Sequence, residues 1–205
     1  MGQYFDNDNL KSKITEYKTK IFDIEFCFNT DNGVFSKSKL DYGTRLLLEN
    51  IPLQELKGEI LEVGSGYGVI PIILSKVCDA KFEGIDVNIR ALNLAKINAK
   101  KNNCKNVMFY ESNCYHNVNK KYDFIITNPP IRAGKEIVYE ILGGAKRYLK
   151  ENASLFLVIN KDQGAKTIIR FLENIYEVSI LNKNKGFFVI RCDLRWQLAL
   201  NMLII

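Results

Sequence analysis

Short apolar runs alternate with longer segments of helical periodicity along most of the chain. The runs that predict strands lie at 60–64, 81–86, 107–111, 122–127, 154–159, 176–182 and 186–192. The periodic segments that predict helices lie at 40–50, 68–77, 89–102, 135–149 and 163–174. This alternation predicts a parallel sheet with helices on both faces, preceded by a β-rich stretch at about 20–36.

The last two predicted strands flank a short polar segment, 182–186, that contains Gly186. Such a connection between two β-rich runs is typical of a hairpin turn. The hairpin makes the final strand antiparallel to its neighbour. We therefore expect an α/β fold whose Rossmann-like sheet has seven strands, mostly parallel, with the last one antiparallel.

The first strand of this sheet runs into a loop rich in glycine. Glycine occupies every second position of Gly64–Gly68, and it permits both positive φ and close approach of a ligand to the backbone. A dinucleotide fingerprint would need another glycine where Val69 or Pro71 stands. Because Glu62 lies at the strand end, the loop suits a cationic, amine-bearing ligand better than a bare phosphate.

The second strand also ends in an acidic residue, Asp86, which lies 24 residues after Glu62. A carboxylate at this position can accept hydrogen bonds from both ribose hydroxyls. Taken alone, the glycine loop has a structural explanation as a turn, and Asp86 has one as a helix N-cap. Their joint occurrence with the segment that follows favours a nucleoside-binding site.

Asn128, Pro129 and Pro130 directly follow the strand 122–127. The prolines restrict the backbone, so the segment forms a stiff loop at the carboxyl edge of the sheet, where ligands of such folds bind. If the Asn128 side-chain oxygen and the Pro129 carbonyl each accept one N–H of a planar amine, the nitrogen lone pair is free to attack a methyl group. The segment therefore predicts methyl transfer to an amino group without a strong general base, and His116 is the single histidine.

The spacing Glu-x-Gly-x-Gly-x-Gly resembles that of class I S-adenosylmethionine methyltransferases. Further segments resemble the RsmC-like group of ribosomal RNA guanine-N2 methyltransferases, the methyltransferase small domain, over about residues 20–192. The segments that carry this resemblance are 34–36, 40–48, 61–69, 85–88, 127–135 and 161–165. Within them, the octapeptide that begins at Asn128 is the most discriminating.

The resemblance implies a class I methyltransferase fold, S-adenosylmethionine as the cofactor, and ribosomal RNA or a ribosomal subunit in the cytoplasm as the partner. It implies catalytic roles for Asn128, Pro129 and Pro130. The residues that it implies for cofactor binding are Thr44, Glu62, Gly64, Ser65, Gly66, Gly68, Asp86 and Asn113.

Three differences from related enzymes bear on the substrate or on the donor. Ile131 stands where DNA-adenine and glutamine methyltransferases of similar pattern usually carry Tyr or Phe, which favours RNA guanine. Asn113 replaces the Asp that usually lies near the adenine amine of the donor, and its side-chain oxygen can still accept a hydrogen bond from that amine. The larger ribosomal enzymes also carry a degenerate domain that we do not find here, so the target nucleotide is not predicted. The alternatives are methylation of protein glutamine N5, DNA adenine N6 or a small-molecule amine, and RNA binding without catalysis.

Charge adds a preference for a polyanionic partner. The net charge is +6, and the stretch Lys120–Lys150 contains seven basic and three acidic residues around the Asn-Pro-Pro segment. A solvated helix face explains the cations near residue 150, whereas Arg132 and Lys135 are predicted to contact substrate phosphate.

An aromatic cover for the target base is also expected, since Ile131 supplies only an aliphatic side chain. Phe35 is our candidate for stacking on the flipped base, with a core position in the N-terminal sheet as the alternative. Phe35, Ile131, Arg132 and Lys135 complete the predicted substrate residues.

The chain is predicted to be a single methyltransferase domain over 1–205, with an N-terminal β-rich extension at 1–36 and an apolar tail at 195–205. The tail is too short to span a bilayer and is interpreted as a docking or homodimer segment. We expect no signal peptide and no membrane partner. The five cysteines contain no C-x-x-C pair, so free thiols are expected and no metal site.

Overall fold

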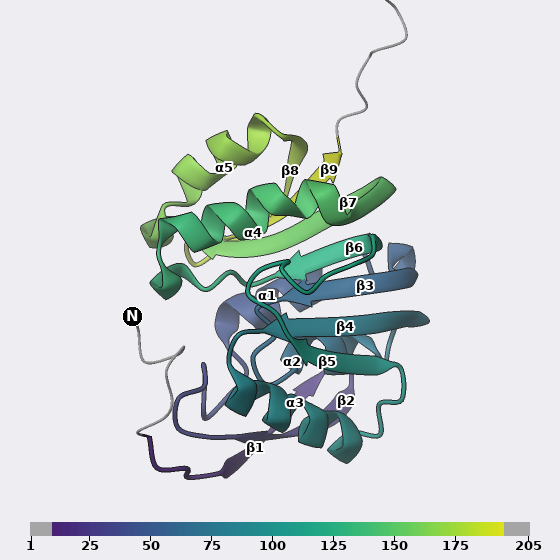
Figure 1. Ribbon diagram of the computed structural model, residues 1–205, viewed down its shortest axis with the longest axis vertical. Helices are drawn as coiled ribbons and strands as arrows, with labels where there is room; N and C mark the ends of the chain where they lie inside the picture. Colours follow the sequence, from purple (N-terminus) through teal and green to yellow (C-terminus); the bar gives the residue numbers. More distant parts are fainter. Residues whose placement is uncertain (1–9, 195–205) are drawn as a thin grey trace, which may run out of the picture.

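A seven-stranded sheet in the order β5-β4-β3-β6-β7-β9-β8 forms the centre of the computed structural model, which describes residues 10–194 (Figure 1). Its strands are β3 (Gly58–Val63), β4 (Ala80–Asp86), β5 (Val107–Glu111), β6 (Tyr122–Thr127), β7 (Leu149–Asn160), β8 (Tyr176–Asn184) and β9 (Phe187–Leu194). The pairs from β5 to β7 are parallel, whereas β9 is antiparallel to both β7 and β8. The predicted sheet with its antiparallel last strand is confirmed.

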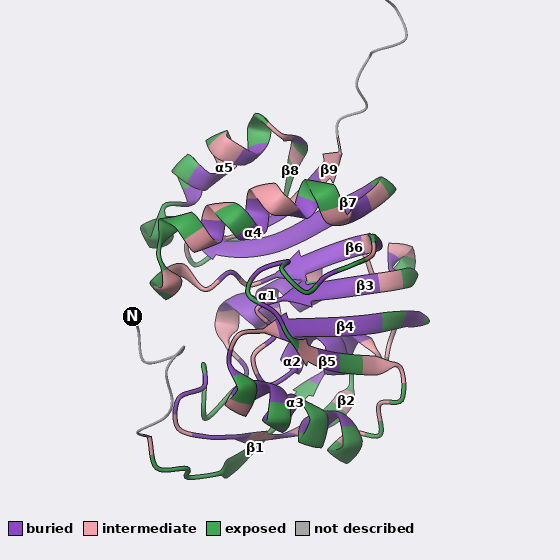
Figure 2. Cartoon of the chain, viewed as in Figure 1, coloured by how far each residue is buried: buried purple, intermediate pink, exposed green. Residues whose placement is uncertain are grey.

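Helices cover both faces of the sheet. On one face lie α1 (Tyr42–Asn50), α2 (Val69–Leu74) and α3 (Ile89–Lys101), and on the other lie α4 (Lys135–Tyr148) and α5 (Ala165–Glu173). Successive strand residues point to opposite faces, so Ile60 joins the first apolar core and Leu61 the second. Figure 2 shows the strands buried between helices whose outer faces are exposed. Three short 3-10 turns complete the helical segments: η1 (Leu53–Glu55), η2 (Ile131–Ala133) and η3 (Lys161–Gln163).

The N-terminal extension is a separate two-stranded sheet of β1 (Thr15–Ile21) and β2 (Ile24–Thr30). Side chains of α3 hold β2 by its backbone. The Asn98 Oδ1 accepts from Asn29 N at 2.8 Å, and the Asn102 Oδ1 accepts from Cys27 N at 3.0 Å. The strands begin earlier than predicted and end at residue 30, so residues 31–41 form a loop that leads to α1.

Two further predicted boundaries, those of α2 and β7, differ from the structure by three residues or more. The helix expected at 68–77 ends at Leu74, and residues 75–77 continue as hydrogen-bonded turns. Strand β7 begins at Leu149 instead of residue 154, because Leu149 pairs with Tyr122 and an irregularity in the pairing follows. The polar residues at 150–152 concealed this extension. The predicted hairpin turn is confirmed, with Lys185 and Gly186 both at positive φ (45° and 82°), as a two-residue turn of this kind requires.

Three further predictions concern the C-terminal tail, membrane-spanning helices and metal sites. The apolar segment 195–205, interpreted as a docking segment, lies outside the described residues. None of the helices within residues 10–194 has the length and apolar character needed to cross a bilayer. In the same range, no three His, Cys, Asp or Glu side chains are grouped in a way that could hold a metal ion.

Candidate active site

The predicted donor-binding segments meet at the carboxyl ends of β3, β4 and β5. Ile85 O on β4 accepts hydrogen bonds from Gly64 N at 2.8 Å and from Ser65 N at 2.9 Å, which ties the glycine loop to the second strand. Ser112 N donates to Asp86 O at 3.0 Å, which brings in the end of β5. Asn113, the next residue, is exposed beside this junction. The sheet edge therefore gathers segments that are far apart in the sequence.

Asp86 is held with its carboxylate at this edge. Its Oδ2 accepts from Gly66 N at 2.8 Å, and its Oδ1 accepts from Asn88 N at 2.9 Å. Burial raises the pKa of Asp86, and the backbone N–H groups that bind the carboxylate oppose this rise. The N-cap of α3 is Asn88, whose side chain accepts from Ala91 N, so the alternative of Asp86 as the helix cap is excluded. Each carboxylate oxygen keeps a lone pair for a further donor.

Glu62 is a buried acid that forms no ion pair with the residues that the structure describes. Only 5% of the residue is exposed, and its Oε2 has no hydrogen-bond partner among residues 10–194. Burial, followed by the negative charge of Asp86, raises the pKa of Glu62 well above its ordinary value. The buried Ser65 Oγ likewise lacks a partner within the described part of the chain. Buried polar atoms of this kind normally have partners, so this arrangement fits a ligand that brings a positive charge and hydrogen-bond donors.

The glycine loop leaves room for such a ligand. Gly66 has φ +52°, and a Cβ built on it would meet nothing within 4 Å. Gly68, at φ +89°, has no such freedom, because a Cβ there would lie 2.8 Å from the Phe109 ring and 3.0 Å from Ala95. Gly66 is thus explained by backbone conformation and ligand access, whereas Gly68 is also required for packing.

Asn128 is held in one orientation by residues that precede and begin α1. Its Nδ2 donates to Asp41 Oδ2 at 3.2 Å and to Thr44 Oγ1 at 3.0 Å. Because a carboxylate only accepts, the nitrogen of the amide must face Asp41. The Asn128 Oδ1 therefore remains an acceptor at the sheet edge. Asp41 also caps α1 by accepting from Thr44 N at 2.9 Å.

The two prolines form the turn that follows. Pro129 O accepts from Ile131 N and Pro130 O from Ala133 N, both at 2.9 Å. A Cβ built on Gly64 would lie 3.7 Å from Pro130 Cδ, so the Asn-Pro-Pro loop contacts the glycine loop. The predicted catalytic and donor-binding segments are thus neighbours in space. Since a carbonyl has two lone pairs, Pro129 O can still accept a second hydrogen bond.

A hollow of about 120 Å³ lies beside this turn, between the starts of α4 and α5. Predicted substrate residues Ile131 and Lys135 line it together. The other lining residues combine apolar walls with polar groups, and they are Val138, Tyr139, Gln163, Gly164, Thr167 and Ile168.

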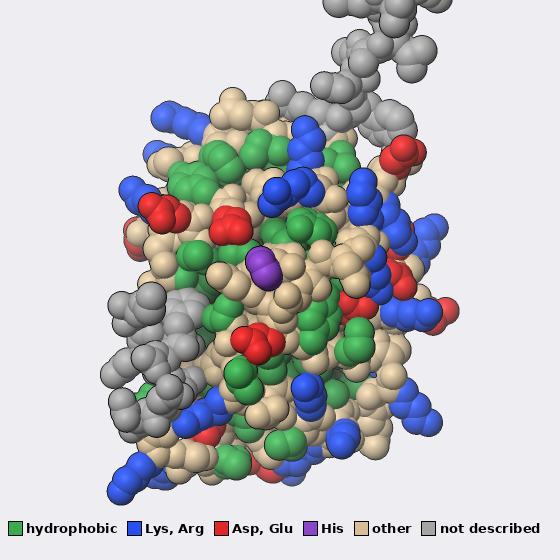
Figure 3. Space-filling view, in the orientation of Figure 1, with side chains coloured by type: hydrophobic (Ala, Val, Ile, Leu, Met, Phe, Trp, Pro, Cys, Tyr) green, Lys and Arg blue, Asp and Glu red, His purple; other side chains and the backbone are tan. Residues whose placement is uncertain are grey.

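The basic residues that surround the Asn-Pro-Pro segment in the sequence do not surround it in space. Lys120 and Lys121 precede β6, whereas Asn128 follows its far end, and a strand of six residues spans roughly 20 Å. Lys146 and Arg147 lie in the last turn of α4, and Lys150 lies near the start of β7. Figure 3 shows Lys and Arg side chains gathered on the right side of this face, where the strands of Figure 1 begin.

Ion pairs further occupy this amino edge of the sheet. Lys120 pairs with Glu59 and Glu83, and Lys150 pairs with Asp123. Of the seven cations, only Arg132 and Lys135 therefore lie beside the Asn-Pro-Pro loop, and those near residue 150 lie at the other end of α4.

The structure places Phe35 on the surface and adds Asp41 to the predicted residues of the site. Phe35 lies in the loop after β2 with 52% of its surface exposed, so the alternative of a core position is excluded. Asp41 was not predicted as a site residue. Its position before a helix indicates a cap, but no local signal shows that it also holds a residue 87 positions later.

Comparison with known proteins assigns the family. The model of the methyltransferase small domain matches residues 25–191. Uncharacterized protein YbxB of Bacillus subtilis (strain 168) is 40% identical over 92% of this chain and 96% of its own length. Ribosomal RNA small subunit methyltransferase C of Colwellia psychrerythraea is 31% identical over 91% of this chain, which spans about half (52%) of that relative.

A solved structure agrees with the fold. The T. thermophilus 16S rRNA N2 G1207 methyltransferase, in complex with AdoMet and guanosine, superposes with a TM-score of 0.80 at 23% identity. The match covers 91% of this chain and 52% of that one. Together with the intact glycine and Asn-Pro-Pro loops, these comparisons show that the chain belongs to the methyltransferase small domain family and is a methyltransferase.

Proposed function

We propose that this protein transfers a methyl group from S-adenosylmethionine to the N2 amine of a guanine in ribosomal RNA. The observation that carries the proposal is the orientation of Asn128, whose amide nitrogen is engaged by Asp41 and Thr44 while its oxygen remains available to a substrate N–H. The Glu62 carboxylate, whose Oε2 has no partner among residues 10–194, lies at the end of β3, and Gly66 lies in the loop that follows.

The donor fits the residues on the sheet edge. We assign its charged amino acid portion to the side of Glu62 and its ribose hydroxyls to Asp86. S-adenosylmethionine supplies, when bound, an electrophilic methyl group on a positively charged sulfur. Ser65, Thr44 and Asn113 are the remaining polar groups that we expect to line this part of the site.

The acceptor nitrogen is prepared by two oxygens. An exocyclic amine is a poor nucleophile because its lone pair is delocalised into the base. When Asn128 Oδ1 and Pro129 O each accept one of its N–H bonds, the nitrogen becomes more tetrahedral and the lone pair can face the methyl group. Such positioning contributes about 7–11 kcal/mol in favourable cases. No strong base is needed, since the nitrogen becomes acidic as it gains the methyl group.

Ribosomal RNA is the favoured substrate for two reasons. The relatives that the chain matches over about half their length are named as ribosomal RNA small subunit methyltransferases. The hollow next to the catalytic turn joins the aliphatic Ile131 to Lys135, which suits a nucleotide with its phosphate. We place the reaction in the cytoplasm, on RNA or on a ribosomal particle, with Arg132 as a further phosphate contact and Phe35 as the residue that covers the base.

The test is to incubate the protein with tritiated S-adenosylmethionine and either naked ribosomal RNA or small ribosomal subunits from cells that lack it. The label should appear in N2-methylguanosine. Asn128→Ala should bind the donor within a few-fold of the parent but turn over at least about 10²-fold more slowly, because the lost contact acts in the transition state. Asn128→Asp, which keeps an acceptor, should be milder.

Two results would contradict the proposal. Label in a glutamine amide or in adenine would assign a different substrate. Near-normal turnover by the Asn128→Ala variant would show that Asn128 only shapes the loop.

A further inference from the structure

The loop segment 31–36, here called the strap, is bound to both halves of the proposed donor site. At one end, Asn88 Nδ2 donates to Gly33 O at 3.1 Å, and the backbone N–H of the same Asn88 donates to the Asp86 carboxylate. At the other end, the Tyr67 hydroxyl donates to Ser36 O at 2.9 Å, and Tyr67 belongs to the glycine loop. The strap thus connects the ribose carboxylate to the loop that faces the rest of the donor.

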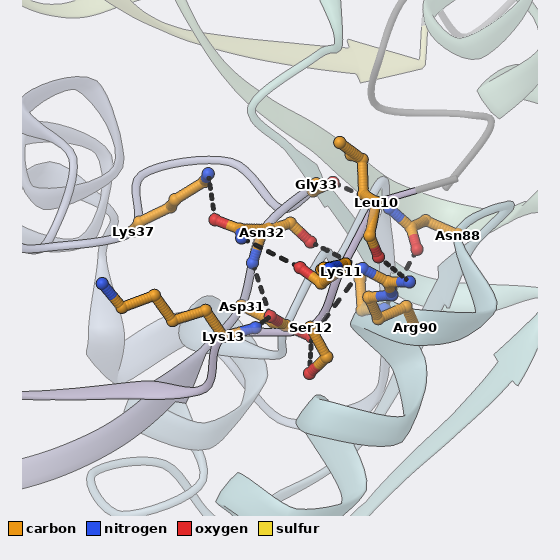
Figure 4. Close-up of polar contacts among 11 residues, drawn as sticks. Leu10, Lys11, Ser12, Lys13, Asp31, Asn32, Gly33, Lys37, Asn88 and Arg90 are labelled. Carbon is orange, nitrogen blue, oxygen red and sulfur yellow. Dashed lines mark hydrogen bonds and ion pairs between the residues drawn. The ribbon is translucent and has the colours of Figure 1, made fainter. Parts of the chain in front are cut away.

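A buried carboxylate fixes the beginning of the strap (Figure 4). Asp31 is only 4% exposed, and it accepts from Ser12 Oγ at 2.7 Å, Lys13 N at 2.5 Å and Asn32 N at 2.6 Å. Burial would raise the pKa of Asp31, but these three hydrogen bonds and the charge of Arg90 outweigh it and lower the pKa. The carboxylate is therefore ionised and fully engaged.

Arg90, in the first turn of α3, joins the same cluster. Its Nη1 lies 3.9 Å from Asp31 Oδ2 and donates to Asn32 O at 3.2 Å, while its Nη2 donates to Leu10 O at 2.9 Å. One guanidinium thus ties two backbone segments, the strap and the segment at Leu10, to the helix that starts directly after Asn88. Figure 4 shows the Asp31 and Arg90 side chains, together with the 10–13 segment and the strap, converging on this point.

We infer that Asp31 and Arg90 are positioning residues for the methyl donor: they hold the strap in place beside the proposed donor site before the donor binds. This inference rests on the proposed donor site. A strap that is already ordered costs no ordering entropy when the ligand arrives, so affinity is higher than for a loop that must be fixed on binding. The exposed Phe35 lies between the two anchored carbonyls, Gly33 and Ser36, and is positioned by the same contacts.

If Arg90 only held the N-terminal sheet in place, its loss would affect donor binding no more than the loss of another residue that attaches this sheet. Arg45 is such a residue and provides the matched control. It also attaches a helix to this sheet, because its Nη2 donates to Thr19 Oγ1 at 3.1 Å and to Lys20 O at 3.0 Å. Arg45 has no contact with the strap among the interactions of the described residues. Arg90→Met and Arg45→Met therefore each remove hydrogen bonds between a helix and the N-terminal part of the chain, but only Arg90→Met removes contacts to the strap.

The experiment measures S-adenosylmethionine affinity by calorimetry and melting temperature for the parent, Arg90→Met, Arg90→Lys and Arg45→Met. Arg90→Met should weaken donor binding at least tenfold, Arg90→Lys should recover part of the loss, and Arg45→Met should stay within twofold of the parent at a similar melting temperature. Amide exchange of residues 33–36 should accelerate in Arg90→Met alone. If Arg90→Met does not fold, Asp31→Asn is measured in its place with the same expectation.

The outcomes separate this inference from the proposed function. Equal losses of affinity in Arg90→Met and Arg45→Met, or an unchanged affinity in Arg90→Met, would overturn the positioning role. The proposed donor would still stand in that case, provided that the parent protein binds S-adenosylmethionine. A parent protein that does not bind S-adenosylmethionine would overturn both.

Discussion

Among single residues, Glu62 has the most distinctive electrostatic situation. In the protein without a donor, burial and the nearby charge of Asp86 raise its pKa, so the protonated form is favoured. A cationic donor favours the ionised form and lowers that pKa. Donor binding should therefore release a proton at pH values between the lowered and the raised pKa, and affinity should increase with pH across this interval and then level off.

Calorimetry in buffers with different ionisation enthalpies measures the released proton directly. In Glu62→Gln the proton release should vanish, and donor affinity at neutral pH should fall by about 1.5–3 kcal/mol, the range for a hydrogen bond to a charged group.

Whereas donor affinity should rise with pH, the contribution of Glu62 to the stability of the donor-free protein should fall as pH rises. An acid whose folded pKa is raised destabilises the fold as pH rises above the unfolded value, near 4.5. Glu62→Gln without donor should thus be at least as stable as the parent at neutral pH. A variant that is both less stable and pH-dependent in donor binding would contradict this account of Glu62.

At the scale of elements, the start of α1 is coupled to the catalytic loop. Asp41 Oδ2 accepts from Thr44 N, which caps the helix, and from Asn128 Nδ2, which orients the amide. Asp41→Ala should lower turnover at least about tenfold with little change in donor affinity, because the amide loses its fixed orientation. It should also lose about 1 kcal/mol of stability with the cap.

Asp41→Asn is the conservative control for both effects. An asparagine oxygen can still accept from either partner, so both turnover and melting temperature should lie near the parent. Single-turnover rates and thermal melts test both variants, and a turnover loss in Asp41→Ala that merely follows the unfolded fraction would disprove the coupling.

At the scale of the whole molecule, the cations of residues 120–150 are divided between two opposite edges of the sheet. Lys135, at the first turn of α4, lines the hollow beside the catalytic turn, whereas Lys146 lies in the last turn of the same helix. Lys135→Gln should weaken RNA binding and reduce the slope of log affinity against log salt by about 1, as expected for one lost phosphate contact. Lys146→Gln removes the same charge at the other end and should leave both quantities unchanged. Equal effects of the two variants would indicate attraction by net charge alone.

The sequence predicted what is local and left out what the fold brings together. Glu62, the glycine loop and Asp86 each lie at the end of an apolar strand, so periodicity alone places them on one edge. The Asp41–Asn128 contact joins residues 87 positions apart and depends on how α1 packs. Likewise, Lys120 and Lys150 are near Asn128 in the sequence but at the opposite end of their strands, because each strand carries the chain across the molecule.

The position of β9 has a consequence for how the protein is made. This strand lies between β7 and β8 although it follows both in the chain. Until residues 187–194 have been synthesised, β8 has no neighbour in the sheet and β7 presents an unpaired edge from a strand whose residues 153–159 are buried in the finished fold. The residues of the donor site and the Asn-Pro-Pro loop all precede this point. A nascent chain that stops short of Phe187 thus carries all residues of the proposed site beside an open apolar edge, and such an edge favours aggregation.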